Sequence, residues 1–113
     1  MGKILQIRVS ANTPFPEEVS RQWPQLCALA WPNGLPNEPE VLGLAQTLYD
    51  QYRFAAEKQP VWKALVDSIG ELNQCRRELE EALADWQPRA ANQASDRLED
   101  MLAAMETAVA AQT

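Results

Sequence analysis

The sequence predicts a mainly α-helical protein, a bundle of about four helices preceded by one β-strand. Three observations lead to this class. Between residues 60 and 86, large apolar side chains recur at spacings of three, four and seven, which is typical of the buried stripe of a packed helix. Three more stretches repeat with a helical period, whereas only residues 3–11 alternate as a strand does. The 113 residues, 46% of them hydrophobic, favour one domain over 1–113 with its own core.

The central helix is expected over residues 60–86, because Pro60 fits a first helical turn. Its apolar stripe consists of Trp62, Leu65, Ile69, Leu72, Leu79, Leu83 and Trp86. Arg76 stands where the spacing predicts another apolar residue. Gly70 lies inside this helix, where a glycine costs up to about 1 kcal/mol relative to alanine. We expect it to let another helix approach closely.

The last helix is expected over residues 89–111, after a short break at Gln87 and Pro88. The break favours an antiparallel hairpin, and the alternative is one kinked helix over 60–111. In a hairpin, residues whose numbers sum to about 175 lie opposite each other, which places Arg76 level with Glu99. These two residues are therefore the candidate register pair. Two other interpretations of Arg76 are a guanidinium that reaches water and an anion site shared with Arg77.

The first half of the chain contains two further helical segments. Residues 14–31 form a helical segment kinked or split at Pro24, with Thr13 as its cap. Residues 38–58 form the next helix, which we expect Asn37 and Glu40 to start as a capping box. Phe54 lies opposite the apolar stripe of this helix, which makes it a candidate for an additional contact surface. The inner face of residues 14–31 is expected to contain Val19, Trp23, Leu26, Cys27 and Ala30.

Residues 3–11 are expected to form a half-buried strand with Leu5, Ile7 and Val9 on one face. The rest of the sequence contains no second convincing strand, so the pairing partner must come from elsewhere. The favoured partner is the same strand of a second copy, antiparallel across a two-fold axis, which predicts a homodimer. The alternatives are a strand from another protein and an extended arm that lies along the helices.

The charge of the chain limits its partners. The net charge is −6, and residues 60–113 carry ten acidic groups against five basic ones. Such a surface repels polyanions, so neither nucleic acid nor an anionic membrane is an expected partner. The apolar run at residues 4–9 is broken by Gln6 and Arg8, which argues against a signal peptide, and we expect a cytoplasmic location.

The sequence offers no catalytic constellation. Histidine is absent, and with it the commonest general base and metal ligand. Cys27 and Cys75 belong to no CxxC motif, and we interpret both as small buried apolar residues. The carboxylate clusters at 78–85 and 96–100 are interpreted as solvated helix faces. We therefore expect no enzyme activity, no cofactor and no metal site.

The function that these properties favour is protein binding. We expect a small acidic, non-enzymatic interaction module, adaptor or chaperone-like, that acts as a homodimer. The candidate interface residues are Trp31, which precedes the loop at 32–39, and Phe54. Four tryptophans in so short a chain leave an alternative open, a small-molecule-binding helical bundle with a Trp-lined pocket.

Overall fold

The structure is a computed structural model that describes residues 6–7, 11–55 and 61–112. This part of the chain contains two short strands followed by five helices, which are β1 (Gln6–Ile7), β2 (Ala11–Asn12), α1 (Glu17–Gln22), α2 (Pro24–Ala30), α3 (Val41–Ala55), α4 (Val61–Ala84) and α5 (Pro88–Gln112). The mainly helical class is confirmed. None of the described helices is both long enough and apolar enough to cross a membrane.

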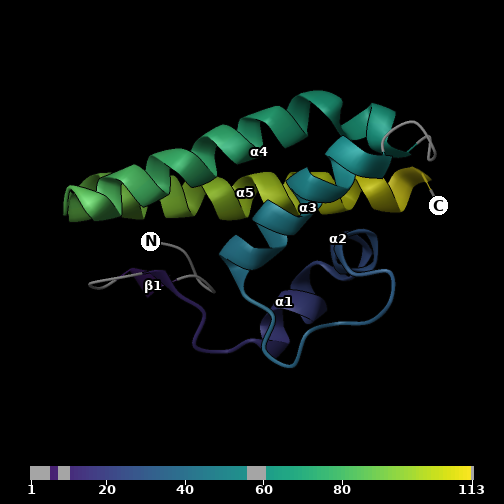
Figure 1. Cartoon of the computed structure of the whole chain (residues 1–113), viewed down its shortest axis with the longest axis horizontal. Coiled ribbons are helices and arrows are strands. Elements are labelled where there is room, and N and C mark those ends of the chain that lie inside the picture. The colour runs from purple at the N-terminus through teal and green to yellow at the C-terminus, as the bar shows by residue number, and fades with distance from the viewer. Residues whose placement is uncertain (1–5, 8–10, 56–60, 113) are drawn as a thin grey trace.

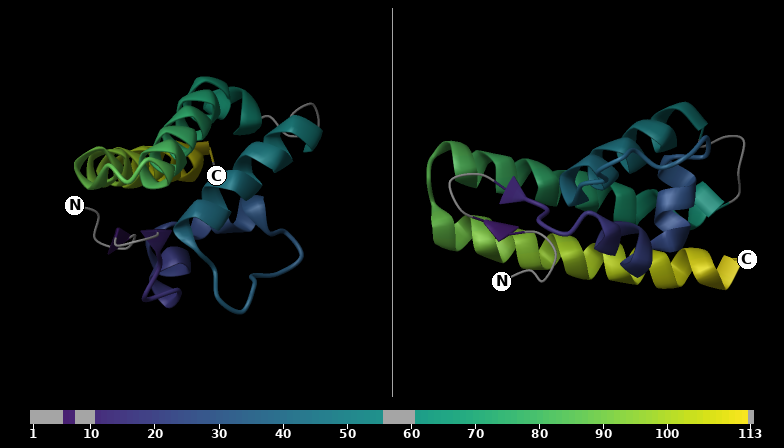
Figure 2. Two further views of the ribbon diagram at one scale, coloured as in Figure 1. Left: turned by 60° about the vertical axis from the view of Figure 1, so that its left-hand side comes forward. Right: turned by 90° about the horizontal axis from the view of Figure 1, so that it is seen from below.

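The two long helices, α4 and α5, form an antiparallel hairpin (Figures 1 and 2). Helix α3 packs on α4, α2 packs on α3 and α5, and α1 packs on α2. The hairpin is thus confirmed over the single kinked helix. The predicted stripe of α4 is fully buried at Leu65, Ile69, Leu72 and Leu79. The Glu78 carboxylate of α4 lies 2.9 Å from the Arg97 guanidinium of α5. These two residue numbers sum to 175, whereas those of Cys75 and Ala94, whose thiol and carbonyl lie 3.2 Å apart, sum to 169. The exact register of the hairpin therefore stays a prediction.

Trp86 was predicted to lie in the apolar stripe of the central helix, but in the structure it lies at the tip of the hairpin, beyond the end of α4. Helix α4 ends at Ala84, and Trp86 has a φ of 48° and a side chain that is 51% exposed. The amides of Trp86 and Gln87 donate to the carbonyls of Leu83 and Ala82 over 3.1 and 2.7 Å, which is the Schellman pattern of helix termination. Trp86 therefore lies outside the buried stripe, because the chain reverses direction there before Pro88 starts α5.

The segment over residues 14–31 is split into two helices. Trp23 adopts the non-helical angles φ −130° and ψ 59°, and Pro24 starts α2. The split is expected from proline, which removes a helical hydrogen bond and clashes with the preceding turn. The five residues predicted for the inner face are all buried, namely Val19, Trp23, Leu26, Cys27 and Ala30.

Helix α3 begins at Val41, three residues later than predicted. Its first helical bond runs from the amide of Leu44 to the carbonyl of Glu40, and Asn37 is exposed in the loop. The predicted capping box is therefore wrong, because Pro39 disfavours helical angles at Glu38. The end of the predicted helix, residues 56–58, lies outside the described residues.

Most of the predicted strand over residues 3–11, including Leu5 and Val9, lies outside the described residues. Ile7 belongs to β1, which pairs with β2 in an antiparallel register that places Gln6 opposite Asn12 and Ile7 opposite Ala11. Strand β1 lies beside α5. Pairing of this segment with a second chain stays a prediction.

Candidate functional site

An exposed aromatic cluster with one cation lies at the C-terminal end of α3. The Phe54 side chain is 80% exposed, as its position opposite the apolar stripe predicts. The Arg53 guanidinium carbon lies 6.0 Å from the centre of the Phe54 ring and 5.9 Å from that of Tyr49. Both distances are within the range of cation–π attraction. We call these three residues the α3 cluster, and they present aromatic and guanidinium groups together at the surface.

Sequence reasoning found only one member of the α3 cluster. The missed signal is the spacing, because Arg53 follows Tyr49 by four residues and directly precedes Phe54. Residues four apart on a helix are neighbours on its surface. An arginine placed between two aromatic residues in this way can therefore be recognised in the sequence itself.

The second predicted interface residue, Trp31, lines a surface depression. Trp31 caps the C-terminal end of α2, and its amide donates to the Cys27 carbonyl. The depression has a volume of about 360 Å³ and lies beside Leu35, which is 50% exposed. Its remaining lining residues are mainly apolar, and they are Ser20, Pro24, Cys27, Ala28, Pro32 and Gly34. Trp31 and Phe54 are thus on different elements and belong to separate surface features.

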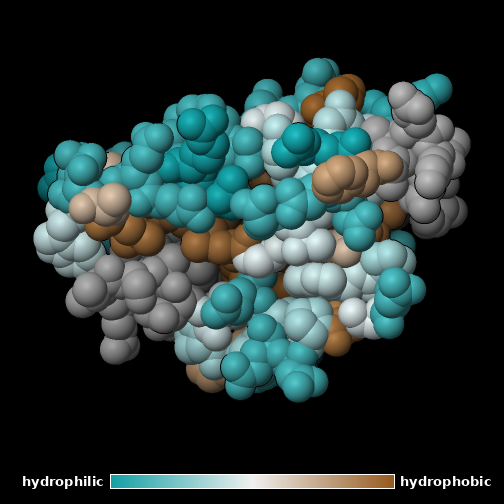
Figure 3. Space-filling view, in the orientation of Figure 1, coloured by the Kyte–Doolittle hydropathy of each residue, from teal (hydrophilic) through white to brown (hydrophobic). Residues whose placement is uncertain are grey.

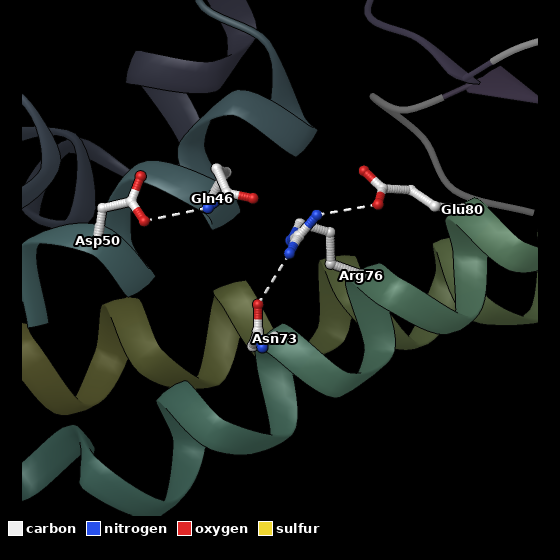
Figure 4. A network of polar contacts seen from close by, with 5 residues as sticks. All are labelled: Gln46, Asp50, Asn73, Arg76 and Glu80. Atoms are coloured by element: carbon white, nitrogen blue, oxygen red, sulfur yellow. Dashed lines mark hydrogen bonds and ion pairs between the residues drawn. The ribbon is translucent and has the colours of Figure 1, made fainter. Parts of the chain in front are cut away.

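Arg76 takes part in a polar network on the side of α4 that faces α3 (Figure 4). Its guanidinium donates to the carboxylate of Glu80 and to the side-chain oxygen of Asn73, each over 3.0 Å. Gln46 of α3 lies nearby and donates to Asp50 over 3.1 Å. Arg76 and Glu80 are four residues apart on α4 and form an ion pair, whereas the register pair of Arg76 with Glu99 stays a prediction. Since the Arg76 side chain is only 13% exposed, Glu80 balances a largely buried charge.

Two helix starts are capped by residues from distant parts of the chain. The Glu106 carboxylate of α5 accepts hydrogen bonds from the amides of Gln25 and Leu26, at 3.0 to 3.1 Å, and so caps α2. The Thr13 hydroxyl accepts from the amide of Val41 over 3.1 Å and caps α3, whereas we predicted it to cap the first helix. Neither contact has a local sequence signal, because the partners are 28 to 81 residues apart.

Both cysteines are buried free thiols, as predicted. Burial, with a smaller contribution from the Glu106 carboxylate, raises the pKa of the Cys27 thiol to about 11. Burial also raises the pKa of Cys75, although the nearby Arg97 opposes the shift. Since the thiolate is the nucleophilic and metal-binding form, the raised pKa values disfavour that form of both cysteines.

The other polar residues and the tryptophans are spread over the described part of the chain. The described residues contain no group of three or more histidine, cysteine, aspartate or glutamate side chains that could hold a metal ion. Glu80, Glu81 and Asp85 are exposed, and the surface of α4 in Figure 3 is mainly hydrophilic. The tryptophans are also dispersed, since Trp23 and Trp62 are core residues and Trp86 lies at the hairpin tip.

No protein-family model matches the chain, and neither a curated protein nor a solved structure shows significant similarity to it.

Proposed function

We propose that this protein is a small acidic, non-enzymatic interaction module, adaptor or chaperone-like, that binds another protein and acts as a homodimer. The α3 cluster is the observation that carries this proposal. Phenylalanine, tyrosine and arginine are enriched in protein interfaces, and arginine and tyrosine recur among the residues that dominate binding energy. An aromatic ring that is 80% exposed loses unfavourable contact with water when a partner covers it.

The cation makes the α3 cluster more selective than an exposed phenylalanine alone. Arg53 lies against both rings, and its guanidinium forms no ion pair with an acidic side chain among the described residues. A partner that covers Phe54 can therefore offer Arg53 a carboxylate, which forms a charge-assisted hydrogen bond. The free buried thiols support a location in the reducing cytoplasm.

The experiment on this proposal compares Phe54→Ser with a control at another exposed phenylalanine, Phe15→Ser. Phe15 is 55% exposed and lies outside the α3 cluster. Tagged full-length chains are expressed in the source cells and purified at matched levels. We expect the wild type and Phe15→Ser to retain one stoichiometric protein that Phe54→Ser loses. Equal retention by all three chains would exclude the α3 cluster as the binding surface.

The homodimer is tested by the mass in solution. Light scattering on a sizing column is compared for the full chain, for a chain without residues 1–11 and for Ile7→Pro. We expect a dimeric full chain and two monomeric variants, because a strand that cannot donate its amide cannot continue an intermolecular ladder. A monomeric full chain would refute the dimer, and three dimers would place the interface on the helices.

The Trp31 depression favours a second candidate function, the binding of a small apolar molecule. Its volume of about 360 Å³ lies within the range of small-molecule pockets. We expect a ligand to quench Trp31 fluorescence in a metabolite screen, and Trp31→Phe to remove that signal. Leu35→Asp should abolish binding, because it places a carboxylate on the apolar wall. A screen without a shift in the wild type would leave protein binding as the stronger function.

A further inference from the structure

A groove runs between α4 and α5, and its lining differs from that of the α3 cluster. It has a volume of about 340 Å³. Gly70, Cys75 and Met101 supply an apolar floor, and Glu71, Glu78 and Arg97 supply charged groups around it. We call this feature the hairpin groove. It combines residues from both long helices, so it exists only where the hairpin is closed.

Gly70 leaves space in the groove because it has no side chain, and it makes α4 less stable than an alanine would. No packing contact among the described residues requires a glycine there. The residue is exposed in the middle of α4, and a Cβ atom built on it meets no heavy atom within 4 Å. The predicted close approach of another helix at Gly70 is therefore not made by the described part of this chain. A glycine inside a helix is less favourable than an alanine, so an alanine there would be both accommodated and stabilising.

Acidic residues form a stripe along the same side of α4. Their spacing of four and three residues follows the helix, with Gln74 as the one uncharged position. The stripe consists of Asp67, Glu71, Glu78, Glu81 and Asp85. Like charges at i,i+3 and i,i+4 destabilise a helix. Arg97 is the one basic side chain that lines the groove, and it is already paired with Glu78. The α4 wall of the groove therefore carries a net negative charge.

We infer that the hairpin groove docks a basic amphipathic helix of a partner protein. Such a helix places apolar side chains over Gly70 and Met101 and lysine or arginine side chains against the acidic stripe. The charge argues against a second copy of this chain as the occupant, because two copies would bring acidic stripes together. This inference rests on the proposed interaction function but uses a surface separate from the α3 cluster.

The test uses the full chain and a fluorescent 18-residue amphipathic peptide of leucine and lysine as the probe. Binding is measured by fluorescence anisotropy at low and at physiological salt. Gly70→Leu fills the groove without changing its charge, and Ala103→Leu adds the same side chain at an exposed position of α5 away from the groove. We expect Gly70→Leu to weaken binding about tenfold or more, and Ala103→Leu to bind as the wild type does.

A second pair of variants tests the charge. Asp67→Lys combined with Glu71→Lys should weaken binding more strongly at low salt than Glu38→Lys does, since Glu38 lies in the loop before α3. A leucine–glutamate peptide of the same pattern should not bind. Equal affinity of Gly70→Leu and the wild type would overturn the groove as the site. Circular dichroism checks that each variant is folded. We expect Phe54→Ser to bind the peptide as the wild type does, because Phe54 belongs to the α3 cluster and not to the hairpin groove. This result would distinguish the groove from the surface that carries the proposed function.

Discussion

The α4–α5 hairpin and the α1–α3 segment achieve their helical structure by different means. Each long helix contributes a regular apolar stripe, and α4 ends with hydrogen bonds to its own last turn. The three N-terminal helices are shorter, and the starts of α2 and α3 are capped by Glu106 and Thr13 from outside those helices. The hairpin is therefore specified by local sequence periodicity, whereas the starts of α2 and α3 depend on contacts that only the complete fold provides.

The same difference appears where each helix ends. Gln51 of α3 donates to the Ala30 carbonyl and so satisfies the C-terminal end of α2 from a neighbouring helix. In the hairpin, the Schellman bonds at Leu83 and Ala82 need no outside partner, but they place Trp86 in a left-handed conformation that favours glycine. Four predictions test this contrast.

The largest effect is expected for Leu72→Ala in the hairpin. Leu72 is 1% exposed, and we expect the free energy of unfolding to fall by about 2–5 kcal/mol, because the lost methyl groups leave a cavity. Urea denaturation followed by circular dichroism measures the change. Val66→Ala is the control on the same helix, since Val66 is 44% exposed and should change stability by less than about 1 kcal/mol. A Leu72 effect below that value would mean that the hairpin core lies elsewhere.

Removing the remote cap should have a smaller and more local effect. Glu106→Ala is expected to destabilise the protein by about 1–2 kcal/mol, because the amides of Gln25 and Leu26 lose a charged acceptor. Hydrogen exchange should show lower protection in α2 before any loss in α4. Glu81→Ala removes an exposed carboxylate from α4 and serves as the control. Unchanged protection of α2 would show that its N-terminal end does not depend on Glu106.

The strained tip of the hairpin predicts a gain in stability. Trp86→Gly should stabilise the protein by about 0.5–1 kcal/mol, because glycine adopts a positive φ without a steric penalty. Ala103→Gly places the same residue inside α5 and should destabilise by about 1 kcal/mol. Thermal unfolding of both variants measures the two signs. A loss of stability in Trp86→Gly would show that contacts of the indole outweigh the backbone strain.

The last effect is absent at neutral pH and concerns the Cys27 thiol at alkaline pH. Its pKa is about 11 in the folded chain and about 8.5 in an unfolded one, so the unfolded chain releases the proton first. The free energy of unfolding should therefore be unaffected by this group below pH 8.5 and should decrease between pH 8.5 and 11. Urea denaturation at pH 7, 8.5 and 10 should give a steeper decrease for the wild type than for Cys27→Ala. Parallel decreases would contradict the raised pKa.

The parts of the fold that sequence reasoning predicts correctly are those with local causes. The stripes of α4 and α5, the split at Pro24 and the exposure of Phe54 follow from helical period and from proline chemistry. The predicted start of α3 is wrong by three residues, because its cap is the Thr13 hydroxyl and not the local Asn37. The exposure of Trp86 is not predicted, because Trp86 fits the apolar period of α4. That period gives no sign that the helix ends at Ala84, two residues before Trp86.

The candidate site also contains features that the sequence predicts and features that only the fold reveals. Trp31 and Phe54 are predicted singly from composition and period, and the spacing of Arg53 to Tyr49 and Phe54 is a sequence signal that was missed. The depression beside Leu35, in contrast, depends on the placement of neighbouring side chains. Gly70 stands out in the sequence because it is a weak helix former, but its open surroundings depend on the position of α5.

The cap that Glu106 provides also sets an order of events during synthesis. Leu26 leaves the ribosome 80 residues before Glu106 does. At the usual rate of about 5–20 residues per second, α2 waits about 4–16 s for the carboxylate that completes its first turn. A seven-residue helix is not stable alone over that time. Although α2 is synthesised early, its cap is therefore complete only after α5 has emerged.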